Sequence, residues 1–262
     1  MTTDPTGGWI DSARAYINFQ DAEDPNRTLL LDPIMLDLCG DVAGKRVLDL
    51  GCGEGRFCRM LAERGALCTG IDLISEMARI ARSRDASPNR YAIAEAARLP
   101  FRDASFDLAV SYVTLVDIPD FRGAIAECTR VLRPGGAIVV ANLGFCTANA
   151  LPNTGWVRDQ GNKRVHYAID HYADERGKWY EWVGIRIENW HRPLSSYMQA
   201  YLSAGLVLTH FDEPVPADDS LRDDPHFEDW YRIPMFTTMR WLKPRRAPVA
   251  ALAEELTAQP EA

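Results

Sequence analysis

The residues best suited to chemistry begin with three glycines at alternate positions, Gly51, Gly53 and Gly55, in the segment GCGEG, with Cys52 between the first two. A strand-like run, KRVLDL over residues 45–50, precedes them, and a helical pattern over 56–64 follows. A strand that turns into a helix through glycines lets a ligand approach the backbone where a side chain would block it. Arg56 stands where a dinucleotide fingerprint would have its third glycine, which disfavours a pyrophosphate cradle.

Two carboxylates flank this glycine loop. Asp72 closes the next strand-like run, 67–72, where a carboxylate can accept both hydroxyls of a ribose. That position alone suits a nicotinamide or an S-adenosylmethionine cofactor, and a helix-capping Asp is the alternative. Asp49 precedes the loop and either lies at the ligand or is a buried carboxylate that holds the glycine turn through backbone N–H groups.

The elements that position these residues alternate in type between residues 45 and 142, a pattern typical of βαβ units and a parallel sheet. Strands are expected at 45–50, 67–72, 90–95, 106–112 and 137–142, and helices at 56–64, 75–84 and 121–132, the last ended by Pro134-Gly135-Gly136. Six of the seven Trp and all five His follow residue 143. Val165–His191 alternates as antiparallel strands do, and a helix at 195–204 and strands at 206–211 and 235–241 complete the pattern.

Composition narrows the function classes. The chain has 262 residues and a formal net charge of -8, from 37 acidic and 29 basic side chains, which disfavours nucleic acid as a partner. The short basic run at 243–246 lies beside an expected tail. There is no signal-like N-terminus and no stretch near the ~20 apolar residues of a spanning helix, so we expect a cytoplasmic protein without a membrane partner. The six cysteines form no C-x-x-C pair, which favours buried free thiols over disulfides or a metal site.

Four segments in order, VLDLGCGEGRF, GID, AEAARLPFRDASFD and VLRPGG, resemble the class I S-adenosylmethionine-dependent methyltransferases, in the small-molecule branch often described as methyltransferase type 11. The match covers residues 45–142. The resemblance implies S-adenosylmethionine as cofactor and S-adenosylhomocysteine as product. It also implies an α/β fold: a Rossmann-like, doubly wound, mostly parallel seven-stranded sheet with an antiparallel edge and an inserted antiparallel β cover.

The resemblance also assigns cofactor contacts. The three loop glycines would pass under the methionine moiety, Asp72 would hold the ribose, and Glu95 stands where the family usually has Asp at the adenine amino group. The remaining implied contacts are Leu73 and Met77 near the adenine, the backbone of Ala96 beside Glu95, and Ser111 and Tyr112 at the methyl-donor end.

The N-terminal segment is expected to close over this site. Trp9, Tyr16 and Phe19 have spacings that let two or three share a helix face, and Trp9 and Tyr16 are candidate substrate contacts. Arg27 can pair with the cofactor carboxylate through a bidentate guanidinium, and a surface salt bridge is an equal alternative.

Candidate catalytic and substrate residues lie mostly in the inserted cover. Methyl transfer depends chiefly on positioning and water exclusion, and a base helps a hydroxyl or amine acceptor. His191, in the segment NWHRPL, is the first candidate base, with a capping or backbone-bonding His as the alternative. The other candidate bases are His166, His171 and Asp117, and the other candidate substrate contacts are the aromatic residues Tyr167, Tyr172 and Trp182.

The sequence thus predicts five segments: a helical lid over 1–40, a cofactor-binding core over 41–143, an inserted β cover over 144–194, a C-terminal helix and strands over 195–243, and a disordered tail over 244–262. The expected activity is methyl transfer to N or O of a small, partly apolar metabolite in secondary metabolism. The alternatives are a nicotinamide-dependent oxidoreductase and a non-catalytic S-adenosylmethionine-binding protein. Exposed aromatics of the cover leave a homo-oligomer open.

Overall fold

The computed structural model describes residues 6–22, 24–149, 155–224 and 227–245. Most of the expected tail, residues 246–262, lies outside the described residues. A seven-stranded sheet forms the centre, with the spatial order β10 (Val207–Asp212), β11 (Phe236–Leu242), β5 (Leu132–Leu143), β4 (Phe106–Tyr112), β1 (Arg46–Leu50), β2 (Leu67–Asp72) and β3 (Arg90–Ile93). Strands β3, β2, β1, β4 and β5 pair in parallel, and β11 pairs antiparallel with β5 and β10. The predicted fold class is confirmed.

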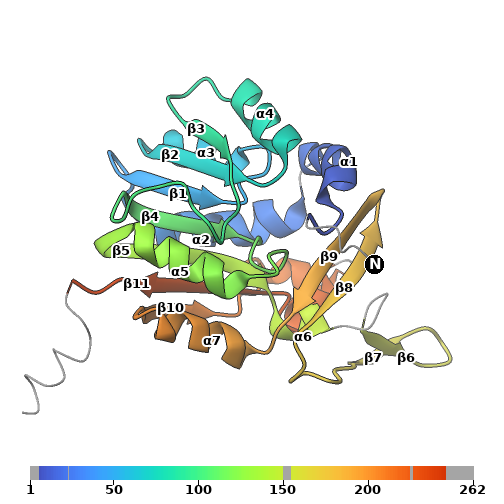
Figure 1. The fold of residues 1–262 in the computed structure, drawn as a ribbon. Coiled ribbons are helices and arrows are strands. Elements are labelled where there is room, and N and C mark those ends of the chain that lie inside the picture. Colours follow the sequence, from blue (N-terminus) through green and yellow to red (C-terminus); the bar gives the residue numbers. More distant parts are fainter. Residues whose placement is uncertain (1–5, 23, 150–154, 225–226, 246–262) are drawn as a thin grey trace, which may run out of the picture.

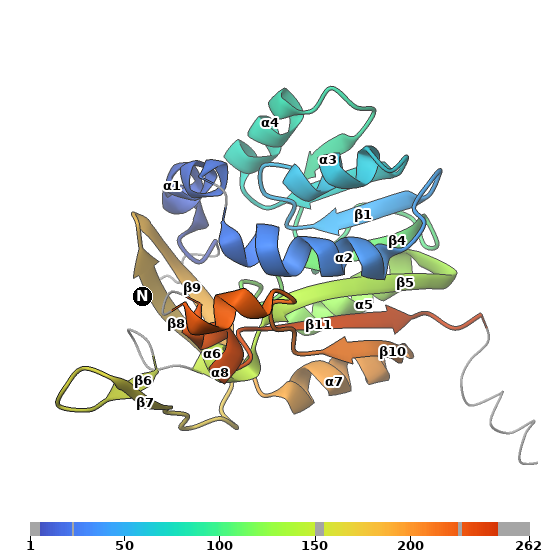
Figure 2. The same ribbon diagram turned by 180° about the vertical axis from the view of Figure 1, so that it is seen from behind.

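Helices cover both faces of this sheet. Helices α5 (Phe121–Val131) and α7 (Leu194–Ser203) lie in front of it in Figure 1, and α2 (Asp32–Cys39) and α3 (Arg56–Ala62) lie on the opposite face, seen in Figure 2. Each layer buries its own apolar cluster: Phe121, Tyr197 and Trp241 belong to the first, and Met35 and Phe57 belong to the second. The helix α4 (Ser75–Arg84) packs along β3.

The strand order reverses beside β1, whose neighbours are β2 and β4. In doubly wound sheets the crevice at such a reversal, outside the carboxyl ends of the strands, is where ligands bind. Helix α1 (Trp9–Asp21) and the hairpin β8 (Arg176–Trp182)–β9 (Ile185–His191) lie beyond these ends (Figure 1).

Shorter elements complete the chain, and the antiparallel strands of the expected cover form two separate hairpins. A second hairpin, β6 (Trp156–Arg158)–β7 (Arg164–Tyr167), forms a sheet separate from β8–β9 and projects to the side (Figure 1). The other short elements are the π-helical turn η1 (Asn26–Leu31), α6 (Phe145–Asn149), the 3-10 turn η2 (Asp219–Asp223) and α8 (Glu228–Arg232).

Strand β5 begins earlier than the sequence predicts. The segment Pro134-Gly135-Gly136 was expected only to end the preceding helix, and helix α5 does end at Val131. The strand nevertheless runs from Leu132, which pairs with Phe106 of β4. Lys243, just after β11, holds the following residues, since Gly135 N–H donates to the Lys243 carbonyl at 2.7 Å and Lys243 N–H donates to the Gly136 carbonyl at 2.8 Å. The expected strand at 90–95 ends early, at Ile93, and the residues after it, including Glu95, turn along the crevice.

Candidate functional site

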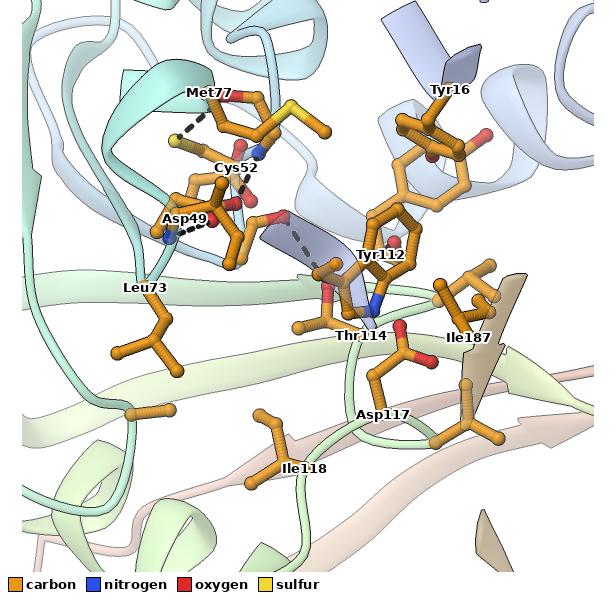
Figure 3. Close-up of a pocket in the computed structure, with 18 of the residues that line it drawn as sticks. Tyr16, Asp49, Cys52, Leu73, Met77, Tyr112, Thr114, Asp117, Ile118 and Ile187 are labelled. Atoms are coloured by element: carbon orange, nitrogen blue, oxygen red, sulfur yellow. Dashed lines mark hydrogen bonds between the residues drawn. The ribbon is translucent and has the colours of Figure 1, made fainter. Parts of the chain in front are cut away.

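A cavity of about 560 Å³ occupies the crevice at the carboxyl ends of β1, β2 and β4. Its walls come from the glycine loop, from α1 and η1, from the loop after β4, and from β9. Figure 3 shows side chains from these elements converging on one space. The cavity therefore brings together residues from the N-terminus, the core and the cover.

The glycine loop forms the floor of this cavity. Gly51 has φ +62°, and a Cβ built on it would lie 2.2 Å from Thr114 Cγ2, so only glycine fits there. Cys52 N–H donates to the Ile71 carbonyl at 2.9 Å, and Gly53 N–H donates to Asp72 Oδ2 at 2.9 Å. The loop backbone is thus exposed to the cavity on one side and fixed to β2 on the other.

Asp72 links the cavity wall to the segment just before the next helix. It lines the cavity, yet its second oxygen, Oδ1, accepts the Ile74 N–H at 2.8 Å just before α4 begins. Burial raises the pKa of Asp72 to about 6, although these backbone hydrogen bonds favour the ionised form. Leu73, Met77, Glu95 and Ala96, which the resemblance assigned to the adenine, all line the cavity.

Asp49 is a buried carboxylate, but it does not hold the glycine turn through backbone N–H groups. Its Oδ2 accepts a hydrogen bond from Cys58 Sγ at 3.3 Å, and Asp72 takes the loop N–H instead. Burial raises the pKa of Asp49 to about 7. All six cysteines are free thiols.

Arg27 is a cavity residue, so the alternative of a surface salt bridge does not hold. Its side chain is only 17 % exposed, and Nη2 donates to the Tyr16 hydroxyl at 2.6 Å. The guanidinium carbon lies 4.7 Å from the centre of the Tyr112 ring, within cation–π range. Its nearest carboxylate contact, Nε to Asp24 Oδ2, is long at 3.8 Å, which leaves the cation available to a second anion.

Asp117 marks the opposite end of the cavity. Asp117 follows β4 and points into the cavity, as Figure 3 shows. Its carboxylate accepts a hydrogen bond from Asn189 Nδ2 on β9. Burial raises the pKa of Asp117 to about 8, against the hydrogen bonds from Asn189 and Trp9 and the positive charge of Arg192. The walls around it are mostly apolar or aromatic: Trp9, Tyr16, Val116, Leu143, Trp182, Ile187 and Phe236.

His191 does not reach the cavity, which corrects its expected place as the first candidate base. Its side chain is fully buried, and Nε2 makes a 2.8 Å hydrogen bond with the Tyr172 carbonyl. Burial lowers the pKa of His191. Tyr172 is also outside the cavity, and its hydroxyl accepts the Leu194 N–H at 3.0 Å, so both residues hold the junction between β9 and α7.

Other expected site residues also lie elsewhere. His166 is exposed on β7 in the projecting hairpin, where Tyr167 packs edge-on against Trp156. His171 is 71 % exposed and pairs with Asp174 through Nδ1 at 3.1 Å. Two core positions are off the cavity wall as well: Ser111 is buried within the sheet, and Gly55 packs under Tyr91 where α3 begins.

Asn189 is one of the cavity residues that the sequence did not predict. The burial pattern of β9 alternates, with Ile185, Ile187 and Asn189 on its buried side. That alternation was a usable signal, because a polar residue among inward-facing apolar ones commonly has a partner. Val113, also missed, has φ +56°, which is rare for a β-branched residue, and it lines the cavity.

The chain is similar in sequence to known methyltransferases. The family model described as "Methyltransferase domain" matches residues 48–140. A malonyl-[acyl-carrier protein] O-methyltransferase of Serratia marcescens is 36% identical over 123 residues, 47% of this chain and 48% of that protein. A ubiquinone biosynthesis O-methyltransferase of Xanthomonas oryzae pv. oryzae is 34% identical over 143 residues, 51% of this chain and 60% of that protein.

A solved structure extends the match beyond the core. The crystal structure of an S-adenosylmethionine dependent methyltransferase from Mesorhizobium loti superposes with a TM-score of 0.72 and 28% identity, covering 80% of this chain and 96% of that chain. The match to curated relatives spans only about half of their length. Motifs, fold and relatives agree that the chain contains a class I S-adenosylmethionine-dependent methyltransferase domain.

Proposed function

We propose that the protein transfers a methyl group from S-adenosylmethionine to a hydroxyl oxygen of a small, largely apolar molecule. The observation that carries the proposal is the single cavity that joins the glycine loop and Asp72 to an aromatic chamber containing Asp117. The names of curated relatives, which include O-methyltransferases, support oxygen rather than nitrogen as the acceptor.

The cavity fits the cofactor in three places. Gly53 leaves open space in the cavity, since a Cβ built on it would meet only the Tyr16 ring at 4.0 Å. Asp72 supplies carboxylate oxygens for ribose hydroxyls, and Arg27 supplies a cation for the methionine carboxylate. When bound, S-adenosylmethionine supplies an electrophilic methyl group on a sulfonium. The apolar end near Asp117 then remains for the acceptor.

The residues of the chain contribute positioning, water exclusion and a proton acceptor. Aromatic and aliphatic walls from α1, β9 and β11 exclude water from the chamber, which favours reaction between two held molecules. Asp117 receives the hydrogen bond of an acceptor hydroxyl and takes its proton as the oxygen gains the methyl group. Burial raises the pKa of Asp117 to about 8, so its ionised form is a stronger base than an exposed carboxylate, and the fraction in that form grows as the pH rises towards 8.

We also propose that α1 acts as the lid of this cavity. The helix is bound to the β9 strand of the cover, because Ser12 Oγ donates to the Arg186 carbonyl at 3.0 Å and accepts the Arg186 N–H at 2.9 Å. Glu188 N–H donates to the Gly7 carbonyl at 2.9 Å. Lid and cover then enclose the chamber together. No helix in the described part of the chain is long and apolar enough to cross a bilayer.

Calorimetry with S-adenosylmethionine, S-adenosylhomocysteine and NAD tests the cofactor assignment. We expect micromolar or tighter binding of the first two and none of NAD. Tighter binding of NAD would revive the oxidoreductase alternative and overturn the proposal. Mass spectrometry then follows methyl transfer to a panel of phenols, alcohols and amines, where products confined to amines would contradict the oxygen assignment and no transfer would favour the non-catalytic alternative.

A further inference from the structure

The loop that carries Asp117 depends on contacts from outside the core sheet. It begins at Val113, whose positive φ of +56° is a strained conformation for a β-branched residue. Such a conformation persists only when surrounding structure determines it. Val113 itself is held by the core, because its N–H donates to the Ala141 carbonyl of β5 at 2.8 Å. The loop residues that follow it are held from the end of β9, about 75 residues away along the chain.

Each of five successive residues, 115–119, accepts a hydrogen bond from the segment 189–192 at the end of β9. Arg192 Nη1 donates to the Leu115 carbonyl at 3.0 Å, and Arg192 Nη2 donates to the carbonyls of Ile118 at 2.6 Å and Pro119 at 3.1 Å. The remaining two bonds run from Trp190 N–H to the Val116 carbonyl, at 2.7 Å, and from Asn189 Nδ2 to the Asp117 carboxylate.

Arg192 is a buried cation, only 1 % exposed. Its hydrogen-bond acceptors above, with the Tyr197 hydroxyl at 3.2 Å, are all uncharged oxygens, and its guanidinium packs 4.3 Å from the Phe121 ring centre. Burying a charge costs several kcal/mol unless its donors are well satisfied. The Arg192 N–H groups are hydrogen-bonded mainly to carbonyls of the Asp117 loop, so the buried cation and the loop conformation depend on each other.

We infer that Asn189 and Arg192 are positioning residues for Asp117: Arg192 fixes the backbone of its loop, and Asn189 orients its carboxylate toward the acceptor chamber. The inference rests on the proposed function for its catalytic meaning. The physical basis is separate, because a side-chain amide that donates to a carboxylate holds one oxygen and stabilises the ionised form. A carboxylate has about four lone-pair sites, so beside the hydrogen bonds from Asn189 and Trp9 it can still accept one from a bound hydroxyl.

The carboxylate contact is tested by NMR titration of protein with 13C-labelled aspartate carboxyls, with the Asp117 signal assigned by its loss in Asp117→Asn. Replacing Asn189 by Leu keeps similar volume and removes the donor. We expect the Asp117 titration to move upward by roughly one pH unit. The matched control is Glu188→Gln, because Glu188 precedes Asn189 and lies outside the cavity. This substitution should leave the Asp117 titration unchanged. An unchanged titration in Asn189→Leu would overturn the role of Asn189.

The backbone contact is tested by hydrogen exchange in Arg192→Gln and Arg192→Lys. The amides of Asp117 and Ile118, which bond within the loop to Thr114 and Leu115, should exchange at least about tenfold faster in Arg192→Gln and less so in Arg192→Lys, with β1 amides as reference. Equal acceleration in β1 would mean general unfolding and unchanged loop exchange would mean no clamp, and either result overturns the role of Arg192. Both tests read out without an acceptor, so they are separable from failure of methyl transfer.

Discussion

The Asp72 carboxylate accepts the Gly53 N–H at 2.9 Å, so the end of β2 is tied to the turn that follows β1. One side chain thereby fixes the glycine loop and presents its oxygens to the same cavity. The affinity for a ligand that bonds this carboxylate therefore depends on the conformation of the loop.

Replacing Asp72 by Asn should weaken binding of S-adenosylhomocysteine at least about tenfold, because an amide offers one acceptor oxygen where two ribose hydroxyls need two. Glu95→Gln should change the affinity less than about threefold, since the amide oxygen still accepts from an adenine amino group. Calorimetry measures both. Similar losses in the two variants would contradict the assignment of the ribose to Asp72.

Arg27 should recognise the amino-acid end of the cofactor. Arg27→Met should weaken S-adenosylhomocysteine about tenfold or more, because a desolvated guanidinium–carboxylate contact is lost. The same variant should bind 5′-methylthioadenosine, which lacks the carboxylate, as the unaltered protein does. An equal loss for both ligands would show that Arg27 acts on the fold instead, through its contacts with Tyr16 and Tyr112.

The core and its cofactor end could be predicted because their signals are local. Strand, glycine turn, helix and second strand follow one another between residues 45 and 72, so periodicity and backbone requirements place Gly51 and Asp72 directly. The early start of β5 escaped prediction because its partners are distant along the chain: Leu132 pairs with Phe106, and Lys243 pairs with Gly135 and Gly136.

The acceptor end was predicted less well for a related reason. The alternation along β9 places Asn189 and His191 on the buried face of the strand. It does not predict which residue each side chain contacts there. His191 forms a hydrogen bond with the Tyr172 carbonyl and is buried, whereas Asn189 donates a hydrogen bond to Asp117 at the cavity. Residue type favoured His191 as a base, and only the three-dimensional pairing reverses the choice.

A chain of ion pairs connects α1 to the glycine loop. Arg84, at the end of α4, bonds Asp21 through both Nη atoms at 2.8 and 2.9 Å and reaches Glu54 Oε2 at 3.2 Å. Glu54 lies in the loop, is 5 % exposed, and also pairs with Arg59 at 2.7 Å. The end of the proposed lid is therefore fastened beside the cofactor end of the cavity.

Arg84→Met should release this contact. We expect faster amide exchange in α1 and a roughly three- to tenfold weaker affinity for S-adenosylhomocysteine at low ionic strength, with a smaller difference at high salt because exposed pairs are screened. Arg79→Met, one turn earlier and 65 % exposed, is the matched control. If the two variants behave alike, the ion-pair chain does not hold the lid.

Three buried carboxyl groups at the site bind protons more tightly than they do in the unfolded chain. Burial raises the pKa of Asp49 to about 7, of Asp72 to about 6 and of Asp117 to about 8, from a usual value of 3.8. Between these values and 3.8 the folded protein holds more protons than the unfolded one. The free energy of unfolding must then fall as pH rises through that interval.

The melting temperature of the ligand-free protein should accordingly decrease by several degrees between pH 5 and pH 8, measured by calorimetry at constant ionic strength. Asp117→Asn should flatten the upper part of this decrease, between about pH 6 and pH 8, because its pKa is the highest of the three. Asp103→Asn, at a carboxylate 77 % exposed, is the control and should follow the unaltered protein. A melting temperature that rises over this range, or an Asp117→Asn profile parallel to that of the control, would show that the Asp117 carboxyl is not held in its protonated form by the folded site.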